Sequence, residues 1–297
     1  MHGMHARLPR NFVLEERLER YADVIELMPS SWAGRWATAC WPLAFGASAD
    51  DTGEHDAGWR AGHHVEHQAD KYREVRLDLG CGKGAFVVES ARREPDVLFV
   101  AMDAEPLCIA YTAQHATEAG LRNVVVVPGQ GSAVARAFGP GELACIHLNF
   151  PTPYPRKKDA DKRLVLLDRL VEYRRVLAPS GTVRLRTDSQ PLRDFALTQF
   201  ELAGYDVVWS SDDERVERPD EPTSEYEERL VAQGARVYGL WATAGDREPQ
   251  TAQTASLSLT DYFPDDLFGD GYVPHGMSGA VVNLRNRRLH ESGGQAR

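Results

Sequence analysis

The chain has 297 residues and a formal net charge of −10 at pH 7. Hydrophobic residues make up 42% and charged residues 26%, a balance typical of soluble globular proteins that excludes wholesale disorder. The longest uncharged stretch of the N-terminal region, 36–49, is shorter than the about 20 residues that a membrane helix needs, so we expect no membrane partner. The four cysteines are widely spaced and form no CxxC pair, and the N-terminus has no signal-peptide pattern, so we expect a cytoplasmic protein.

The N-terminal region divides into two predicted segments. Residues 1–27 are predicted to hold a basic helix, because apolar residues recur there at the helical period among arginines. Residues 28–72 are predicted to form an irregular insertion, because they are rich in Gly, Ser and Asp. His63 and His67 in this insertion have the i,i+4 spacing of a metal clip. No frame of carboxylates or cysteines accompanies them, so we predict a solvated loop and no metal site.

Strands and helices alternate from Val75 onward. The predicted strands are short apolar runs at 75–79, 98–102, 124–127, 144–150, 182–186, 205–210 and 236–242. Helical patterns separate most of them, and such βαβ units build a parallel sheet, so residues 73–245 are predicted to form an α/β domain. Residues 246–297 are predicted to be a linker and a C-terminal extension of unknown role, with a strand-like run at 280–284.

A glycine-rich turn follows the first of these strands. The segment DLGCGKG, residues 78–84, ends a strand and opens a helix, where glycines allow the backbone to approach a ligand closely. An acid two residues before the first glycine is unusual in NAD-binding folds. It is usual in class I methyltransferases, which bind S-adenosylmethionine, because it can hold the ammonium group of the methionine portion. The alternative is a helix-entry turn with a chance acid.

Asp103 adds a second cofactor feature. It ends the second predicted strand, where a carboxylate can accept hydrogen bonds from both ribose hydroxyls. The predicted cofactor contacts from these two segments are Asp78, Gly80, Gly82, Gly84 and Asp103.

A proline-rich loop with a basic run follows the fourth predicted strand. It reads LNFPTPYPRKK over residues 148–158 and lies at the carboxyl edge of the sheet, where substrate meets cofactor in open α/β folds. Residues 150–186 carry ten basic and four acidic side chains, so this part can attract a phosphate backbone although the whole chain is acidic. The alternative is a rigid surface loop with a solvated charge run.

Two shorter motifs complete the pattern, TDS at 187–189 and SEYEERL at 224–230. Together with DLGCGKG and LNFPTPYPRKKDADKRL, they resemble the bacterial tRNA (guanine-N7)-methyltransferase family, whose long element reads LNFPDPWPKKRHxKRRL. The resemblance covers about 75–243. It implies a Rossmann-like class I methyltransferase with a mostly parallel, twisted sheet and helices on both faces. The implied reaction moves a methyl group from S-adenosylmethionine to N7 of guanine 46 in the variable loop of tRNA.

The resemblance also implies roles on the cofactor side. Asp78 and Asp103 match acids that contact the methyl donor. Gln130 falls where the family has an Asp beside the adenine, so a hydrogen-bonding group remains and the charge is lost. Thr152 falls on the Asp of the family's PDPW and is assigned to both cofactor binding and catalysis. Loss of that acid points to a changed rate or a changed substrate.

On the substrate side, Arg156 matches a substrate-contacting Lys, and Asp188 matches the substrate-binding Asp. The residues matching the family's TxxE element are Ser224, Glu225, Tyr226 and Glu227. Guanine N7 has an in-plane lone pair and no proton, so its attack needs no obligatory base. Asp188 and Glu227 are therefore predicted to stabilise the positive charge that develops on the purine. Two alternatives remain open: a methyltransferase of the same lineage acting on another RNA or a small molecule, and an RNA-binding relative without turnover.

Overall fold

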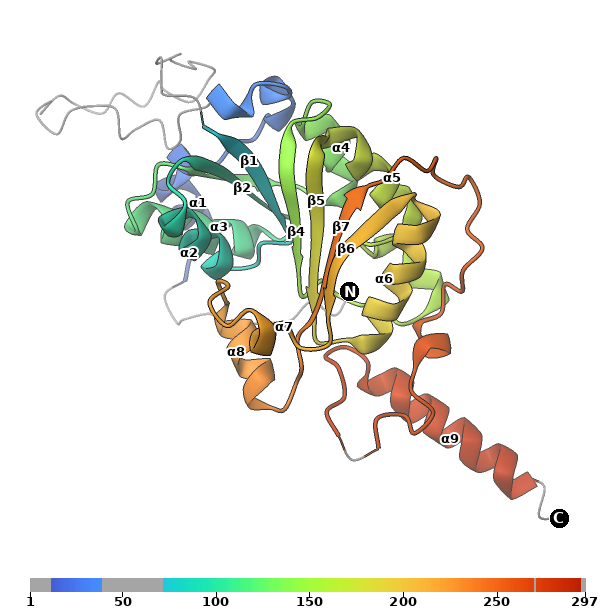
Figure 1. Cartoon of the computed structure of the whole chain (residues 1–297). Coiled ribbons are helices and arrows are strands. Elements are labelled where there is room, and N and C mark those ends of the chain that lie inside the picture. Colours follow the sequence, from blue (N-terminus) through green and yellow to red (C-terminus); the bar gives the residue numbers. More distant parts are fainter. Residues whose placement is uncertain (1–11, 39–71, 270, 295–297) are drawn as a thin grey trace, which may run out of the picture.

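A seven-stranded sheet forms the centre of the molecule (Figure 1). The computed structural model describes residues 12–38, 72–269 and 271–294. The strands are β1 (Glu74–Leu79), β2 (Val97–Asp103), β3 (Val124–Pro128), β4 (Leu143–Asn149), β5 (Leu177–Thr187), β6 (Tyr205–Ser211) and β7 (Tyr238–Ala244). Their order is β3-β2-β1-β4-β5-β7-β6, parallel from β3 to β5, with β7 antiparallel to both neighbours. The predicted mostly parallel α/β fold is therefore confirmed.

Helices cover both faces of the sheet, because its central strands are apolar on both sides. Along β2, Leu98 and Val100 lie in one hydrophobic cluster, with α4, α5 and α6, whereas Phe99 and Ala101 lie in another, with α2 and α3. Successive side chains of a strand alternate between its faces, so these clusters are the two layers of the core. The helices are α1 (Leu14–Arg20), α2 (Ala85–Arg93), α3 (Pro106–Glu118), α4 (Val134–Ala137), α5 (Leu167–Val176), α6 (Gln190–Leu202), α7 (Glu214–Glu217), α8 (Glu225–Ala232) and α9 (Ser278–Gly294).

The carboxyl ends of the parallel strands meet at one edge of the sheet. After β3 the chain crosses back to place β4 on the other side of β1, which makes the gap between β1 and β4 a topological switch point. Ligands of open α/β sheets bind outside the strand ends at such a point. Asp78 near the end of β1, Asp103 at the end of β2 and Asp188 just after β5 all lie at this edge.

Part of the predicted irregular insertion is packed into the core. Residues 28–38 include the short 3-10 helices η2 (Pro29–Trp32) and η3 (Trp36–Thr38). Trp36 is fully buried against Phe138, and its indole N–H donates to the carbonyl of Ala137 at 2.8 Å. His63 and His67 lie outside the described residues, as do the first residues of the predicted basic helix, of which α1 is described.

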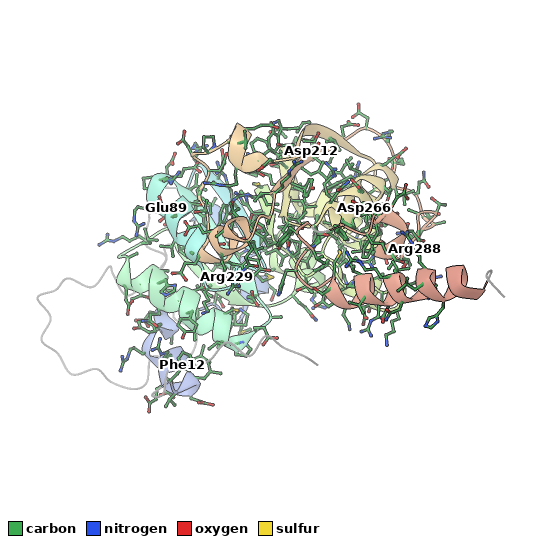
Figure 2. All side chains as sticks on the ribbon, turned by 90° about the horizontal axis from the view of Figure 1, so that it is seen from below. Phe12, Glu89, Asp212, Arg229, Asp266 and Arg288 are labelled. Atoms are coloured by element: carbon green, nitrogen blue, oxygen red, sulfur yellow. The ribbon has the colours of Figure 1, made fainter. Side chains whose placement is uncertain are left out.

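The C-terminal extension packs against the carboxyl edge and then leaves it. Leu259 and Met277 are fully buried, whereas α9 projects from the lower right of Figure 1. The strand predicted at 280–284 is wrong, because these residues belong to α9, in which Val281 is buried and Val282 is exposed. Figure 2 shows Arg288 on this helix and Asp266 in the preceding turn. No helix among the described residues is long and apolar enough to cross a membrane.

Candidate functional site

The turn between β1 and α2 forms the floor of the site. Gly80, Gly82 and Gly84 all have positive φ angles, between 57° and 82°, which side chains with a Cβ rarely adopt. The amide of Gly80 donates to the carbonyl of Met102 at 2.8 Å, which fixes the turn against β2. A Cβ on Gly84 would lie 2.7 Å from Thr112, whereas one on Gly82 would meet nothing within 4 Å. The turn is thus tightly packed at α2 and open at Gly82.

Asp78, beside this turn, has one carboxylate oxygen without a hydrogen-bond partner among the described residues. Its side chain is buried, and the amide of Asn149 at the end of β4 donates to Oδ1 at 3.2 Å. Oδ2 is buried and accepts no hydrogen bond from the described residues. Burial raises the pKa of Asp78 to about 7, against the hydrogen bond from Asn149, and Asp103 raises it further. A cation placed here would pair with the charge that burial makes costly, so the residues fit the ammonium of a methyl donor.

Asp103 is held in place by two backbone amides. Gly82 donates to its Oδ2 at 2.9 Å and Glu105 donates to its Oδ1 at 2.9 Å. Burial raises the pKa of Asp103, and these backbone hydrogen bonds oppose the shift. A carboxylate has about four lone-pair sites, so Asp103 retains acceptor capacity for ribose hydroxyls. Gln130 follows the end of β3 and is exposed; its adenine contact stays a prediction.

The loop after β4 has an unusual backbone. Phe150 and Tyr154 adopt φ angles of 50° and 46°, a region that costs free energy for residues other than glycine. The amide of Phe150 donates to the carbonyl of Arg186 at 2.7 Å. The buried guanidinium of Arg163 donates to the carbonyls of Pro153 at 3.0 Å and Tyr154 at 2.6 Å. The fold therefore imposes the shape of this loop from two sides.

The basic run separates into buried, ion-paired and exposed charges. Arg163 is 1% exposed, stacks over Phe195 and holds the loop, so it does not face solvent. Arg156 and Lys162 are exposed and form ion pairs with Asp159 at 2.8 Å each. Lys157 and Lys158 are exposed side chains of the 3-10 helix η6 (Lys157–Lys162). They are therefore the more available cations for an anionic ligand.

Thr152 lies in a groove rather than in the buried part of the site. It is exposed and lines a groove of about 350 Å³ between the loop after β4 and the start of α9. Its cofactor and catalytic roles stay predictions.

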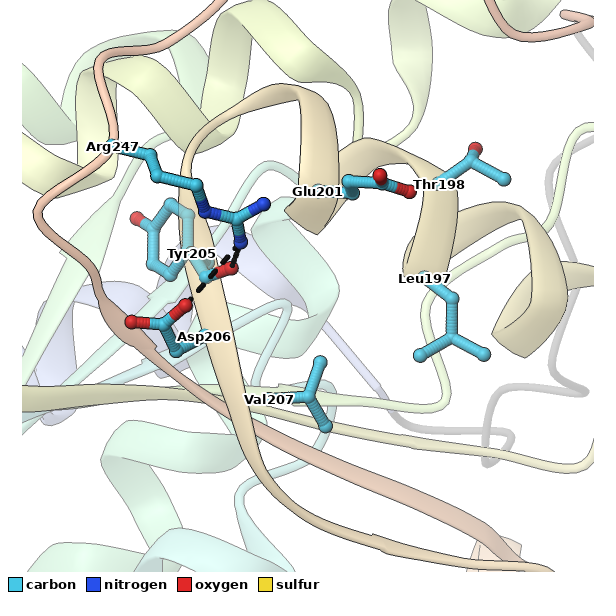
Figure 3. Close-up of a pocket in the computed structure, with 7 residues that line it drawn as sticks. All are labelled: Leu197, Thr198, Glu201, Tyr205, Asp206, Val207 and Arg247. Atoms are coloured by element: carbon cyan, nitrogen blue, oxygen red, sulfur yellow. Dashed lines mark hydrogen bonds and ion pairs between the residues drawn. The ribbon is translucent and has the colours of Figure 1, made fainter.

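A second hollow, of about 450 Å³, lies at the opposite edge of the sheet, where Arg247 donates to the carbonyl of Tyr205 (Figure 3). No predicted site residue lines that hollow.

Asp188 is bound by the C-terminal extension. The hydroxyl of Tyr272 donates to its Oδ2 at 2.6 Å, and the backbone amide of His275 donates to the same oxygen at 2.8 Å. The hydroxyl of Tyr226, on α8, forms a hydrogen bond of 2.9 Å with Nδ1 of His275. The structure thus brings two predicted substrate residues, Asp188 and Tyr226, to one segment that sequence analysis left without a role.

Glu227 lies in a buried group of charges. Its carboxylate is 2.8 Å from the guanidinium of Arg186 and 3.5 Å from that of Arg215. Burial raises the pKa of Glu227, and Arg186 and Arg215 oppose the shift. Ser224 caps α8 by accepting a hydrogen bond from the amide of Glu227 at 3.2 Å, and Glu225 is exposed. A direct guanine contact of Glu227 stays a prediction, whereas its ion pair with Arg186 joins α8 to β5.

Sequence analysis missed three polar residues of this region. Asn149 ends β4 beside β1, so the meeting of strand ends at the switch point could have indicated its contact with Asp78. Tyr272 and His275 carry no motif and lie more than 80 positions from Asp188, so no pattern in the sequence signals their contact. Within the described residues, no group of three His, Cys, Asp or Glu side chains could hold a metal ion.

The strand order, the glycine turn after β1 and the acids at the ends of β1 and β2 define a class I methyltransferase. Residues 72–240 match a family model described as "Putative methyltransferase". The chain is 32% identical over 175 residues to the tRNA (guanine-N(7)-)-methyltransferase of Lactiplantibacillus plantarum, covering 58% of this chain and 81% of that protein. It is 33% identical over 167 residues to the enzyme of the same name from Geobacillus kaustophilus, and the alignment covers 55% of this chain and 76% of that protein. The chain belongs to the tRNA (guanine-N7)-methyltransferase family.

Solved structures with a similar fold include the 16S rRNA methyltransferase KamB. It is 19% identical with a TM-score of 0.47, and the alignment covers 59% of this chain and 89% of that one. The strand order β3-β2-β1-β4-β5-β7-β6 of the chain itself establishes its fold. Tyr272, His275 and α9 lie beyond the residues that match the family model.

Proposed function

We propose that this chain transfers the methyl group of S-adenosylmethionine to N7 of a guanine in tRNA, and that the guanine is at position 46 in the variable loop. The observation that carries the proposal is that a chain of this family holds a buried acid, Asp78, beside the glycine turn, with one carboxylate oxygen unpartnered among the described residues. A cytoplasmic location follows from the proposed tRNA substrate.

The cofactor side of the proposal uses the edge formed by β1, β2 and β3. When bound, S-adenosylmethionine supplies an electrophilic methyl group on a sulfonium. Asp78 accepts hydrogen bonds from its ammonium, and Asp103 accepts them from the ribose hydroxyls. The open backbone at Gly82 leaves room for the ligand. Gln130 and Thr152 remain the proposed contacts on the adenine and methyl sides.

The substrate side requires orientation rather than proton removal. N7 has a free lone pair in the plane of the base, so the protein has to align it and stabilise the cation that forms. Asp188 is proposed to accept hydrogen bonds from the guanine N1–H and amino group, which places a negative charge beside the purine. Glu227 is proposed to act through Arg186, whose carbonyl binds the loop after β4. An acid at position 152 is therefore not obligatory for the reaction.

The tRNA backbone is proposed to contact the exposed part of the basic run. Lys157 and Lys158 face solvent beside the strand ends, and Arg156 lies next to them. Charges at this position attract phosphates over a distance of about a Debye length, even on a chain with a net charge of −10.

The proposal is tested with radiolabelled S-adenosylmethionine and two tRNA transcripts that differ only at position 46, guanine or adenine. We expect label on the first transcript alone, and strand cleavage at position 46 after borohydride and aniline treatment. Label on the adenine transcript would show that the methylated nucleotide lies at another position of the tRNA. Label only on other RNA or on small molecules would favour a different substrate. Donor binding without any transfer would favour an RNA-binding relative.

A further inference from the structure

The segment that contacts Asp188 is short and well defined. We call residues 271–277 the strap; it lies between the turn that holds Asp266 and the first residue of α9. Its residues follow the family-matched region by more than 30 positions. It crosses the carboxyl edge of the sheet at Asp188, the acid proposed to bind guanine.

The strap contacts Asp188 on one oxygen only. The Tyr272 hydroxyl and the His275 amide both donate to Oδ2, and no described residue donates to Oδ1. Asp188 is 7% exposed, so few other orientations are open to the carboxylate. Hydrogen bonds to a carboxylate are short and strong, and two on one atom fix its direction. Oδ1 remains an acceptor for a donor of the substrate.

The strap also holds Tyr226. The ring of His275 forms a hydrogen bond with the Tyr226 hydroxyl and packs edge-on against its ring at 5.8 Å between centroids. Tyr226 in turn packs edge-on against Phe150, the first residue of the loop after β4. A continuous set of contacts therefore runs from Asp188 through His275 to the loop that carries Thr152.

The strap is anchored at its C-terminal end, and the extension that precedes it is bound to the loop after β4. Met277 is fully buried in the main hydrophobic cluster, and the Ser189 hydroxyl, next to Asp188, lies 3.7 Å from its sulfur. Gly276 has a φ of 80°, and a Cβ built there would lie 3.5 Å from Pro153. Twelve positions before the strap, the amide of Leu259 donates to the carbonyl of Pro155 in the loop after β4, at 3.1 Å. Displacing the strap would expose this apolar surface, so it forms a wall of the site rather than a loosely held plug.

We propose that the strap completes the guanine site. Tyr272 and the backbone of His275 hold Oδ2 of Asp188 so that Oδ1 accepts hydrogen bonds from the base, and the His275 ring sets the position of Tyr226. Tyr272 and His275 are positioning residues, because they act through Asp188 and Tyr226. This inference rests on the proposed function and adds residues outside the family-matched segment to it.

The test compares Tyr272→Phe with Tyr262→Phe in the full chain. Both changes remove one tyrosine hydroxyl from the C-terminal extension, but the hydroxyl of Tyr262 donates to the carbonyl of Ser256 and not to the site. We expect Tyr272→Phe to lower kcat/KM for tRNA about tenfold, the order expected for a lost hydrogen bond to a charged group, with an unchanged KM for S-adenosylmethionine. Tyr262→Phe should retain the native kcat/KM.

A double-mutant cycle separates positioning from general stability. Asp188→Asn alone should lower kcat/KM for tRNA, and adding Tyr272→Phe should lower it no further, because Tyr272 acts through that carboxylate. Equal activity of Tyr272→Phe and Tyr262→Phe, additive losses in the double variant, or a gain of activity in Tyr272→Phe would each overturn the inference alone. A native protein that does not methylate tRNA would overturn the proposed function and this inference with it.

Discussion

Asp78 shows how burial at a strand end changes the chemistry of one residue. Its pKa is raised from 3.8 to about 7, chiefly because β1 and the glycine turn remove water from the carboxylate. A bound ammonium favours the ionised form, so the protonated form must lose its proton before the donor binds below pH 7. Donor binding at the proposed ammonium site is therefore expected to be coupled to proton release from Asp78.

We predict that donor affinity falls about tenfold for each pH unit below pH 7, down towards pH 5. Asp78→Asn should bind the donor weakly and lose this pH dependence, because its amide does not ionise. The measurement is calorimetric titration with S-adenosylmethionine across that range. Asp96→Asn is the matched control, since Asp96 pairs with Arg73 at the surface. The same slope in Asp78→Asn and in the native chain would remove Asp78 from the ammonium site.

Thr152 gives a second prediction for a single residue. Because its side chain is exposed, Thr152→Asp adds a carboxylate without burying it, so the fold should tolerate the change. If this position stabilises the cationic guanine, the added charge should raise single-turnover methylation of tRNA about tenfold, which corresponds to about 1.4 kcal/mol. Thr152→Asn, which adds an amide without charge, is the control. Faster methylation by the native Thr152 protein would contradict the prediction.

Single residues also show where the sequence was informative and where it was not. The acids at 78 and 103 were predicted from their places after apolar strands, and the structure brings both to the glycine turn. Arg163 is one of the ten basic residues in 150–186 that predict a phosphate-attracting surface, but it is buried and donates to backbone carbonyls. Charge in a sequence does not reveal exposure, which depends on packing against Phe195 and the loop after β4.

At the scale of elements, α8 presents Tyr226 and Glu227 from a helix whose first turn depends on one cap. We predict that Ser224→Ala lowers the free energy of unfolding by about 1 kcal/mol, because the amide of Glu227 loses its side-chain acceptor. Ser224→Asn should retain most of the stability, since Asn also caps helices. Urea unfolding at neutral pH measures both. If the Ser224→Ala and Ser224→Asn variants unfold with the same free energy, Ser224 has no capping role.

The boundaries of elements were predicted less well than their existence. β5 begins at Leu177, where Leu177 pairs with Leu143 of β4, whereas the sequence predicts a start at 182. The predicted start is too late because residues 177–181 contain Pro and Gly, which are typical of a turn. The run at 280–284 was predicted as a strand from its valines. In the structure it lies in the first turns of α9, where Val281 is buried and Val282 is exposed.

At the scale of the molecule, an acidic protein is proposed to bind an acidic RNA through a local basic surface. We predict that Lys157→Glu with Lys158→Glu weakens tRNA binding and reduces the slope of log K against log salt, because fewer counterions are released. Donor affinity should not change. The control is Arg92→Glu with Arg93→Glu at the end of α2, which reverses the same number of charges at exposed arginines that pair with Glu89. Binding isotherms at several salt concentrations decide; equal slopes for the two double variants would exclude a phosphate contact of the lysines.

Some contacts of the site depend on the fold of the whole molecule, and the sequence alone does not predict them. Each strand end and its acid can be predicted locally, because period and turn residues are local signals. The contact between Asp188 and the strap joins residues 84 and 87 positions apart, and it exists only because the extension folds back over the sheet edge. Such a contact is decided by tertiary packing of residues such as Met277.

The position of β7 between β5 and β6 has a consequence for biosynthesis. As the chain leaves the ribosome, the parallel strands β1 to β5 emerge first and can already pair with one another. β6 emerges next, but within the described sheet it pairs only with β7, which is translated later, so β6 stays unpaired until β7 has emerged. The strap follows later still. We therefore expect a nascent chain to acquire its proposed donor-binding half before its proposed guanine-binding half, so that a partly translated chain could bind the donor before it could hold the base.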